Sequence, residues 1–203
     1  VAELCLAGAL ERLGRPVEWP DQPPDAKYSS PEAFDFVATS APRTVISVAL
    51  GDREAEAAMR LAESLEAVAP DWSVHLHLCN ASPAIAEAAT AWTGERAGRA
   101  TVSTETLVTD PPTSLAERFG VIRLRTFAAL GAALNEMGGG DLILVHPRTV
   151  FAEAPDALLP DADQGVSLAI REGLLWDQIG QELIGVCSGD AASAFLAEIR
   201  TAA

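Results

Sequence analysis

The sequence predicts an α/β domain built on a mostly parallel, twisted sheet with helices on its faces. From residue 44 onward, apolar stretches of strand length alternate with amphipathic stretches of helix length, which is the order found in βαβ proteins. The two clearest apolar stretches, 44–50 and 141–146, are almost continuous, as expected of strands buried on both faces. With 49% hydrophobic residues, a chain of 203 residues can bury one sizeable core.

The first 43 residues do not follow this pattern. Leucines at helical spacing predict a short helix over 1–14, which Gly14 ends. The stretch 15–43 contains prolines, which interrupt both helices and strands, at Pro16, Pro20, Pro23, Pro24, Pro31 and Pro42. We therefore predict an N-terminal helix and Pro-rich arm over 1–43 and an α/β domain over 44–203. The arm is expected to pack on the domain or on a protein partner.

The domain opens with a strand, a helix and a second strand. The stretch 44–50 is rich in β-branched residues and predicts a buried strand. Gly51-Asp52 follows at once and begins a helix that Pro70 ends. The apolar stripe of this helix consists of Ala58, Leu61, Ala62, Leu65 and Val68. The stretch 73–79 alternates between polar and apolar residues and predicts the second strand.

A second helix follows the turn at 80–83 and runs to about Trp92, with Pro83 favourably placed in its first turn. A weaker strand is predicted at 100–103. The remaining elements are a loop at 110–113, a helix at 115–137, strands at 141–146, 165–170 and 183–187, and a closing helix at 190–201. The three glycines at 138–140 precede a strand, so we interpret them as a helix stop and turn rather than a phosphate-binding loop.

Charge and cysteine content exclude several classes of protein. The formal net charge of −15 opposes binding to nucleic acid or to anionic membranes, although three arginines cluster at Arg118, Arg123 and Arg125. No apolar stretch reaches the roughly 18 residues of a membrane span. Three widely spaced cysteines without a zinc pattern favour a reducing, cytoplasmic setting, with the thiols acting as small buried groups.

Ligands of parallel sheets bind beyond the carboxyl ends of the strands, so the residues that follow each strand are the first candidates for a site. These residues are Gly51, Asp52, Arg53, Asn80, Ser82, His146 and Arg148. His75 and His77 lie two residues apart and would share one face of a strand. The sequence shows no third ligand beside them, so we predict no metal site and expect them to pack against a helix.

From residue 44 to the end, the order of elements resembles the GT-A fold, a Rossmann-like fold of nucleotide-diphospho-sugar glycosyltransferases. The resemblance covers about three-quarters of the chain and has three parts. The first, 44–80, has a strand ending in Gly51-Asp52, a position that helps to hold the nucleotide base in such enzymes. The second, 123–151, has a basic-x-x-x-Phe helix pattern followed by a buried strand. The third, 154–172, leads through Pro155-Asp156-Ala157-Leu158-Leu159 and Asp161-Ala162-Asp163 to a strand.

The chain departs from this family after the central strand. The family has an Asp-x-Asp pair there, which holds a divalent cation on the sugar-nucleotide diphosphate. This chain has His146-Pro147-Arg148, and arginine cannot ligate a cation. In one interpretation Arg148, assisted by Arg123 or Arg125, contacts the diphosphate directly. In the other, catalysis has been lost and the fold remains as a binding or structural component. Asp161-Ala162-Asp163 is interpreted as a solvated turn.

The resemblance also implies residues for catalysis. Trp176-Asp177-Gln178 is similar to an Asp-Gln pair near the acceptor site of some glycosyltransferases, where Asp177 or Glu172 would serve as general base. An Asp in a loop beside a half-buried Trp is the alternative. We therefore expect a degenerate GT-A-like domain with a binding or structural role. The alternative is a metal-independent glycosyltransferase that uses a nucleotide-diphosphate sugar as donor and needs no cofactor.

Overall fold

The computed structural model describes residues 43–106, 140–161, 165–170 and 179–187, together with Ala194. The predicted N-terminal helix, the Pro-rich arm and most of the predicted closing helix lie outside these residues. The predicted helix at 115–137 also lies outside them, and so do the predicted site residues Arg123, Glu172 and Asp177.

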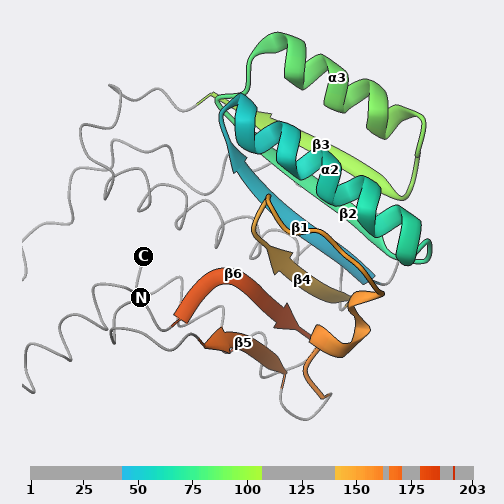
Figure 1. Ribbon diagram of the computed structural model, residues 1–203, viewed down its shortest axis with the longest axis vertical. Coiled ribbons are helices and arrows are strands. Elements are labelled where there is room, and N and C mark those ends of the chain that lie inside the picture. The colour runs from blue at the N-terminus through green and yellow to red at the C-terminus, as the bar shows by residue number, and fades with distance from the viewer. Residues whose placement is uncertain (1–42, 107–139, 162–164, 171–178, 188–193, 195–203) are drawn as a thin grey trace, which may run out of the picture.

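A six-stranded sheet forms the centre of the described fold (Figure 1). Its strands lie in the order β3-β2-β1-β4-β6-β5. Their bounds are β1 Arg43–Leu50, β2 Ser73–Cys79, β3 Ala100–Glu105, β4 Asp141–Val145, β5 Val166–Ile170 and β6 Ile179–Val186. β3, β2, β1 and β4 are parallel to one another, whereas β6 runs antiparallel to β4 and β5 runs antiparallel to β6. The prediction of a mostly parallel sheet is confirmed.

Two helices cover one face of the parallel strands. α2, Asp52–Val68, follows β1, and α3, Pro83–Gly94, follows β2; Figure 1 shows both on the same side of the sheet. Among the residues that α2 buries are Ala58, Leu61, Ala62 and Leu65 of the predicted stripe. A short 3-10 helix, η2, covers Pro155–Leu158. Among the described helices, none has both the length and the apolar character that crossing a bilayer requires.

The predicted strands, and the two predicted helices that lie within the described residues, are present, with differences at their ends. β3 continues to Glu105, beyond the predicted end at residue 103, and β6 begins at Ile179 rather than at residue 183. In both cases the backbone pairing extends past the apolar residues, as far as the ladder with the neighbouring strand continues. Sequence hydrophobicity marks only the buried part of such strands.

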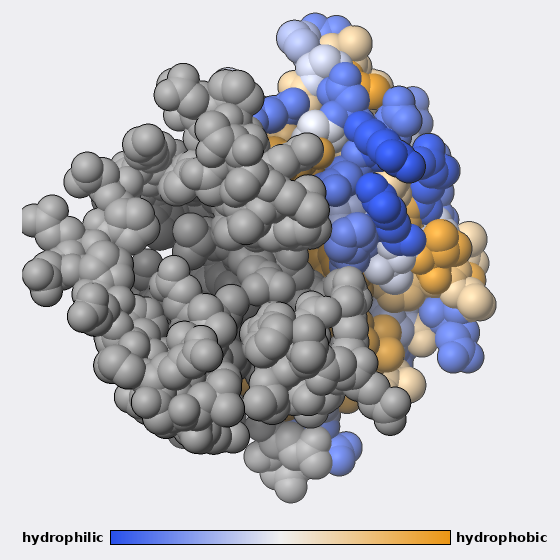
Figure 2. All heavy atoms as spheres, turned by 60° about the vertical axis from the view of Figure 1, so that its left-hand side comes forward, coloured by the Kyte–Doolittle hydropathy of each residue, from blue (hydrophilic) through white to orange (hydrophobic). Residues whose placement is uncertain are grey.

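β2 is buried along its whole length, although its sequence alternates. Val74, Leu76 and Leu78 belong to the apolar core with residues of α2. His75 and His77 alternate with them and therefore point to the other face of the sheet. The alternation in β2 thus separates an apolar face from a polar face, and both are covered. Seen from a second direction, the described surface is mostly hydrophilic with smaller apolar patches (Figure 2).

Candidate functional site

Backbone hydrogen bonds join the turns that follow β1, β2 and β3 at the carboxyl edge of the sheet. The N–H of Gly51 donates to the carbonyl oxygen of Cys79 at 2.8 Å, and the N–H of Asn80 donates to the carbonyl oxygen of Glu105 at 2.7 Å. Gly51 has φ of 75° and ψ of 174°, a region that glycine occupies without strain, and Asn80 has φ of 53°. The structure therefore brings the predicted residues Gly51 and Asn80 to one edge.

The two carboxylates at the start of α2 accept hydrogen bonds from backbone N–H groups. The Oδ1 atom of Asp52 accepts a hydrogen bond of 2.6 Å from the N–H of Ser82, the residue before α3. The Oε2 atom of Glu54 accepts a hydrogen bond of 3.0 Å from the N–H of Leu50 at the end of β1. Asp52 thus holds the β2–α3 turn against the β1–α2 turn. Arg53, next to Asp52, is exposed.

The residues that replace the acidic pair form a tight turn after β4. The N–H of Thr149 donates to the carbonyl oxygen of His146 at 2.9 Å, and the N–H of Arg148 donates to His146 Nδ1 at 3.2 Å. The His146 side chain therefore shapes the turn, and Arg148 is exposed at its tip. Within the part of the chain that the structure describes, the Arg148 guanidinium makes no hydrogen bond or ion pair. Such a cation is available to an anionic ligand.

The turn at His146–Thr149 lies at the same edge as the Gly51 and Asn80 turns. β4 is parallel to β1, with Ile46 in register with Leu144, so β4 ends before β1 does. The chain then crosses to α2, where the N–H of Phe151 donates to Ser64 Oγ at 3.0 Å. The structure shows no direct contact between Arg148 and the side chains of Asp52 or Asn80 in the described residues.

A chain of side-chain hydrogen bonds covers the polar face of β2 and β3, which sequence reasoning missed. Thr101 Oγ1 lies 2.8 Å from His75 Nδ1, and His75 Nε2 lies 3.0 Å from Ser103 Oγ. Ser103 Oγ also lies 2.8 Å from His77 Nδ1, and His77 Nε2 lies 3.3 Å from Glu105 Oε2. The two histidines share a face, as predicted, and the described partners of their rings come from the neighbouring strand β3.

Cys79 and Glu105 complete a group of potential metal ligands with His77. One ligand atom from each of the three lies within 4.8 Å of the others, and we call this group the His77–Cys79–Glu105 cluster. The sequence did show one signal, because His75, His77 and Cys79 have the spacing of residues on one face of a strand. Glu105 could be added only once the register of β3 was known, with Cys79 opposite Glu105.

Burial shifts the pKa values of His75 and Cys187, and it makes the thiols of Cys79 and Cys187 inaccessible. The pKa of His75 is lowered to about 3, first because its ring is desolvated and second because His77 lies beside it. His75 is therefore neutral at physiological pH. Cys79 and Cys187 are buried thiols, as predicted. Burial raises the pKa of Cys187, with a further contribution from the negative charge of Asp141, so the neutral thiol is favoured over the thiolate.

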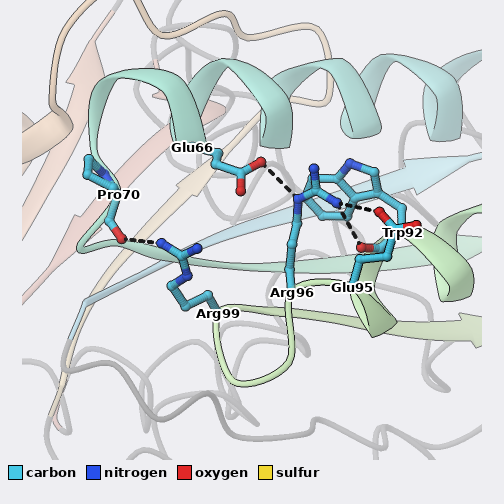
Figure 3. A network of polar contacts seen from close by, with 6 residues as sticks. All are labelled: Glu66, Pro70, Trp92, Glu95, Arg96 and Arg99. Carbon is cyan, nitrogen blue, oxygen red and sulfur yellow. Dashed lines mark hydrogen bonds and ion pairs between the residues drawn. The ribbon is translucent and has the colours of Figure 1, made fainter.

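A shallow hollow lies at the opposite edge of the sheet, between α2, α3 and the amino ends of β2 and β3. Arg96 lines the hollow; its guanidinium carbon lies 4.3 Å from the centre of the Trp92 ring, and its Nε donates to Glu66 at 2.8 Å (Figure 3). Arg99 donates to the carbonyl oxygen of Pro70 at 3.0 Å. The nearby charges are thus paired within the protein, and the network joins the ends of the two helices to the start of β3.

Comparison with known proteins places the fold. No protein-family profile and no curated protein sequence matches the chain. Among solved structures, the galactosyltransferase LgtC, in complex with donor and acceptor sugar analogs, is similar at 16% identity and a TM-score of 0.50. The match covers 71% of this chain and 57% of LgtC, so the chain spans little more than half of that enzyme.

Two further similar structures are glycosyltransferases. GlyE of Streptococcus pneumoniae TIGR4 is 10% identical at a TM-score of 0.47, over 78% of this chain and 37% of GlyE. The mannosyltransferase PcManGT of Pyrobaculum calidifontis, in complex with GDP-Man and Mn²⁺, is 14% identical at a TM-score of 0.43, over 92% of this chain and 52% of that enzyme. The similarity to LgtC confirms the predicted resemblance at the level of the fold: this chain has the α/β fold of GT-A-type glycosyltransferases.

Proposed function

We propose that this chain is a degenerate GT-A-like domain that binds a nucleotide-diphosphate sugar at the carboxyl edge of its sheet and has a binding or structural role. The observation that best supports this proposal is the position of Arg148. Its exposed guanidinium follows the central strand β4, where the family has its acidic pair. LgtC, which has a similar fold, was solved with donor and acceptor sugar analogs.

The chemistry of Arg148 is suited to a diphosphate. A guanidinium offers planar pairs of N–H donors that match phosphate oxygens, and it is charged at any physiological pH. It can therefore supply the positive charge that a divalent cation supplies to sugar nucleotides elsewhere. Gly51 and Asn80 lie at the same edge, and a Cβ atom built on Gly51 would meet no atom within 4 Å. Arg53 and Arg123 are proposed to assist with charge.

A binding role is favoured over catalysis by the carboxylates that the structure describes at this edge. Asp52 and Glu54 both accept hydrogen bonds from the backbone, and Glu105 lies beside His77, so each of these carboxylates already has a partner within the protein. The alternative is a metal-independent glycosyltransferase with Asp177 or Glu172 as general base. Turnover of a donor sugar, measured as release of free nucleotide, distinguishes the alternative from a binding role.

The setting of the domain is also a proposal. Buried Cys79 and Cys187 fit a reducing, cytoplasmic compartment. The Pro-rich arm at 15–43 is proposed to contact a protein partner, because a proline-rich segment presents an extended backbone at little entropic cost.

Calorimetric titration with UDP and GDP, with and without Mn²⁺, tests the nucleotide site. We expect binding that does not need Mn²⁺ and that is lost in Arg148→Ala. Arg60→Ala is the matched control, because Arg60 is exposed on α2 and away from the carboxyl edge. Absence of binding to either nucleotide, or equal binding by Arg148→Ala and the parent protein, would refute the nucleotide site. A requirement for Mn²⁺ would refute the role given to Arg148.

A further inference from the structure

We propose that the His77–Cys79–Glu105 cluster binds one transition-metal ion of the zinc class. This site differs from the nucleotide site in its residues, and the inference does not depend on the proposed function. The cluster lies on the face of the sheet opposite α2 and α3, at the ends of β2 and β3. Three arguments support it: the geometry of the ligand atoms, their chemical type, and the hydrogen bonds that orient them.

Only small side-chain movements would bring the three ligand atoms to the distances of a tetrahedral zinc site. Nitrogen, sulfur and oxygen ligands of a tetrahedral zinc, bound at about 2.0–2.3 Å, lie roughly 3.3–3.8 Å apart. The three ligand atoms of the cluster lie within 4.8 Å of one another, and His77 Nε2 is already 3.3 Å from Glu105 Oε2. The parallel register sets Cys79 opposite Glu105, with His77 two residues before Cys79 on the same face. The sheet therefore holds the three residues before any metal arrives.

The donor set selects the class of metal. An imidazole nitrogen and a thiolate favour Zn²⁺ and similar ions, whereas Mg²⁺ and Mn²⁺ prefer oxygen ligands. The side chain of His77 is 3% exposed and that of Glu105 is 15% exposed, so the carboxylate is the member nearest to solvent. Glu105 is thus placed to admit an ion. Three protein ligands leave a fourth position for water or for a bound molecule.

The hydrogen-bonded chain allows His77 to exist in either tautomer. Without metal, the bonds can run from the Thr101 hydroxyl to His75, on to Ser103 and His77, and end at the Glu105 carboxylate. In this direction His77 donates its Nε2 proton to Glu105. The Thr101 hydroxyl donates and the Glu105 carboxylate accepts, and each group between them donates one of these hydrogen bonds and accepts one, so each of the four bonds has a proton.

Metal binding requires the opposite direction, which the same residues permit. The ring nitrogen Nε2 of His77 then binds the ion, and its Nδ1–H donates to Ser103 Oγ, which donates to His75. The number of protons in the chain does not change, and the Cys79 thiol releases one proton to solvent. Such hydrogen bonds to the second ring nitrogen orient metal-binding histidines and increase their affinity. His75 and Ser103 are therefore positioning residues for the site.

Cobalt binding gives a direct test on the full chain. The protein is treated with EDTA, returned to buffer containing a non-thiol reductant, and titrated with Co²⁺ while the absorption spectrum is recorded. We expect one ion per chain with a thiolate-to-cobalt charge-transfer band and visible bands of tetrahedral intensity. Zn²⁺ should displace the cobalt, and Mn²⁺ should not. Failure to bind one equivalent, or binding without the thiolate band, would overturn the proposal.

Substitutions of single residues test whether the thiolate-to-cobalt band comes from the His77–Cys79–Glu105 cluster. Cys79→Ser should lose the charge-transfer band, whereas Cys187→Ser should keep it, because Cys187 is a buried thiol elsewhere that contacts the carbonyl oxygen of Pro160. Ser103→Ala should weaken Zn²⁺ binding by about 10–100-fold, as the loss of orienting hydrogen bonds does at other metal sites. Glu105→Gln, a nearly isosteric change, should also weaken binding while circular dichroism shows an intact fold. Equal affinity in Glu105→Gln and the parent would overturn the assignment.

Discussion

The two faces of β2 share one backbone and one degree of burial, but they are covered in different ways. On the side of α2 and α3, Val74, Leu76 and Leu78 pack into the apolar core. On the other side, His75 and His77 are equally inaccessible and are held by hydrogen bonds to β3. Burial on the first face is stabilised by the removal of apolar surface from water, and burial on the second depends on satisfied polar groups.

This difference separates two requirements of the fold. The apolar face tolerates small changes of shape but not loss of volume, because its energy scales with buried area and packing. The polar face tolerates no loss of a partner, because each hydrogen bond there replaces one to water. The polar face is also the only one of the two with groups that can bind an ion. Substitutions on the two faces should therefore differ in their effects on stability.

The largest expected effect is on the apolar face. Leu76→Ala removes a fully buried side chain from the middle of β2 and should lower the free energy of unfolding by about 2–5 kcal/mol. Urea denaturation followed by circular dichroism measures the change. A loss below about 1 kcal/mol would show that the helices do not pack on β2 as described.

Ser103→Ala tests the polar face and should have the next largest effect among the substitutions at neutral pH. The Ser103 hydroxyl bonds both His75 and His77, so its removal breaks the hydrogen-bonded chain at its centre. We expect the free energy of unfolding to fall by about 1–3 kcal/mol, although the change removes a single oxygen atom. The same denaturation measurement, made with EDTA present, separates this effect from metal binding. An unchanged free energy of unfolding would contradict the hydrogen bonds from Ser103 to His75 and His77.

The pH dependence of stability provides a third test of the polar face. Because the pKa of His75 is about 3 in the folded protein and 6.5 in the unfolded chain, the unfolded chain binds more protons between these values. Stability should therefore fall as the pH drops below 6.5, by roughly 1.4 kcal/mol per pH unit, and this contribution should level off near the folded pKa.

The acidic residues of the chain also titrate in this range, so the informative quantity is a difference between proteins. His75→Gln should show a smaller dependence of stability on pH than the parent, with both measured in EDTA. A glutamine can accept and donate hydrogen bonds but cannot take up a proton. Equal slopes in the two proteins would show that His75 does not resist protonation.

Much of the described fold could be predicted from the sequence, because β1, β2 and β4 each have a clear local pattern of apolar residues, and only β3 had a weaker one. Thr44–Leu50 and Asp141–Val145 are apolar runs, and their buried strands follow from that pattern alone. The turn at Gly51 was likewise predicted as the start of α2. These signals are local, and the structure confirms them.

The polar cluster could not be predicted in the same way. His77 and Cys79 are close in sequence, but Glu105 reaches them only through the register between β2 and β3, which no local pattern specifies. The alternation of β2 predicted a strand, but it could not distinguish an exposed polar face from a covered one. The availability of Arg148 also depends on the turn that His146 shapes, a contact visible only in three dimensions.

Ser47→Ala is the smallest expected effect and the sharpest contrast with Ser103→Ala. Ser47 lies on the helix-covered side of β1, between the core residues Val45 and Ala49, and its hydroxyl is buried without a hydrogen-bond partner among the described residues. Removing a buried hydroxyl that has no partner removes a desolvation penalty, so we expect stability to change by less than about 0.5 kcal/mol or to rise. Ser47→Ala and Ser103→Ala each delete one serine Oγ atom, so the two variants differ only in the surroundings of the hydroxyl. If the two serine variants lose equal stability in urea, the distinction between an apolar face and a hydrogen-bonded face of this sheet is wrong.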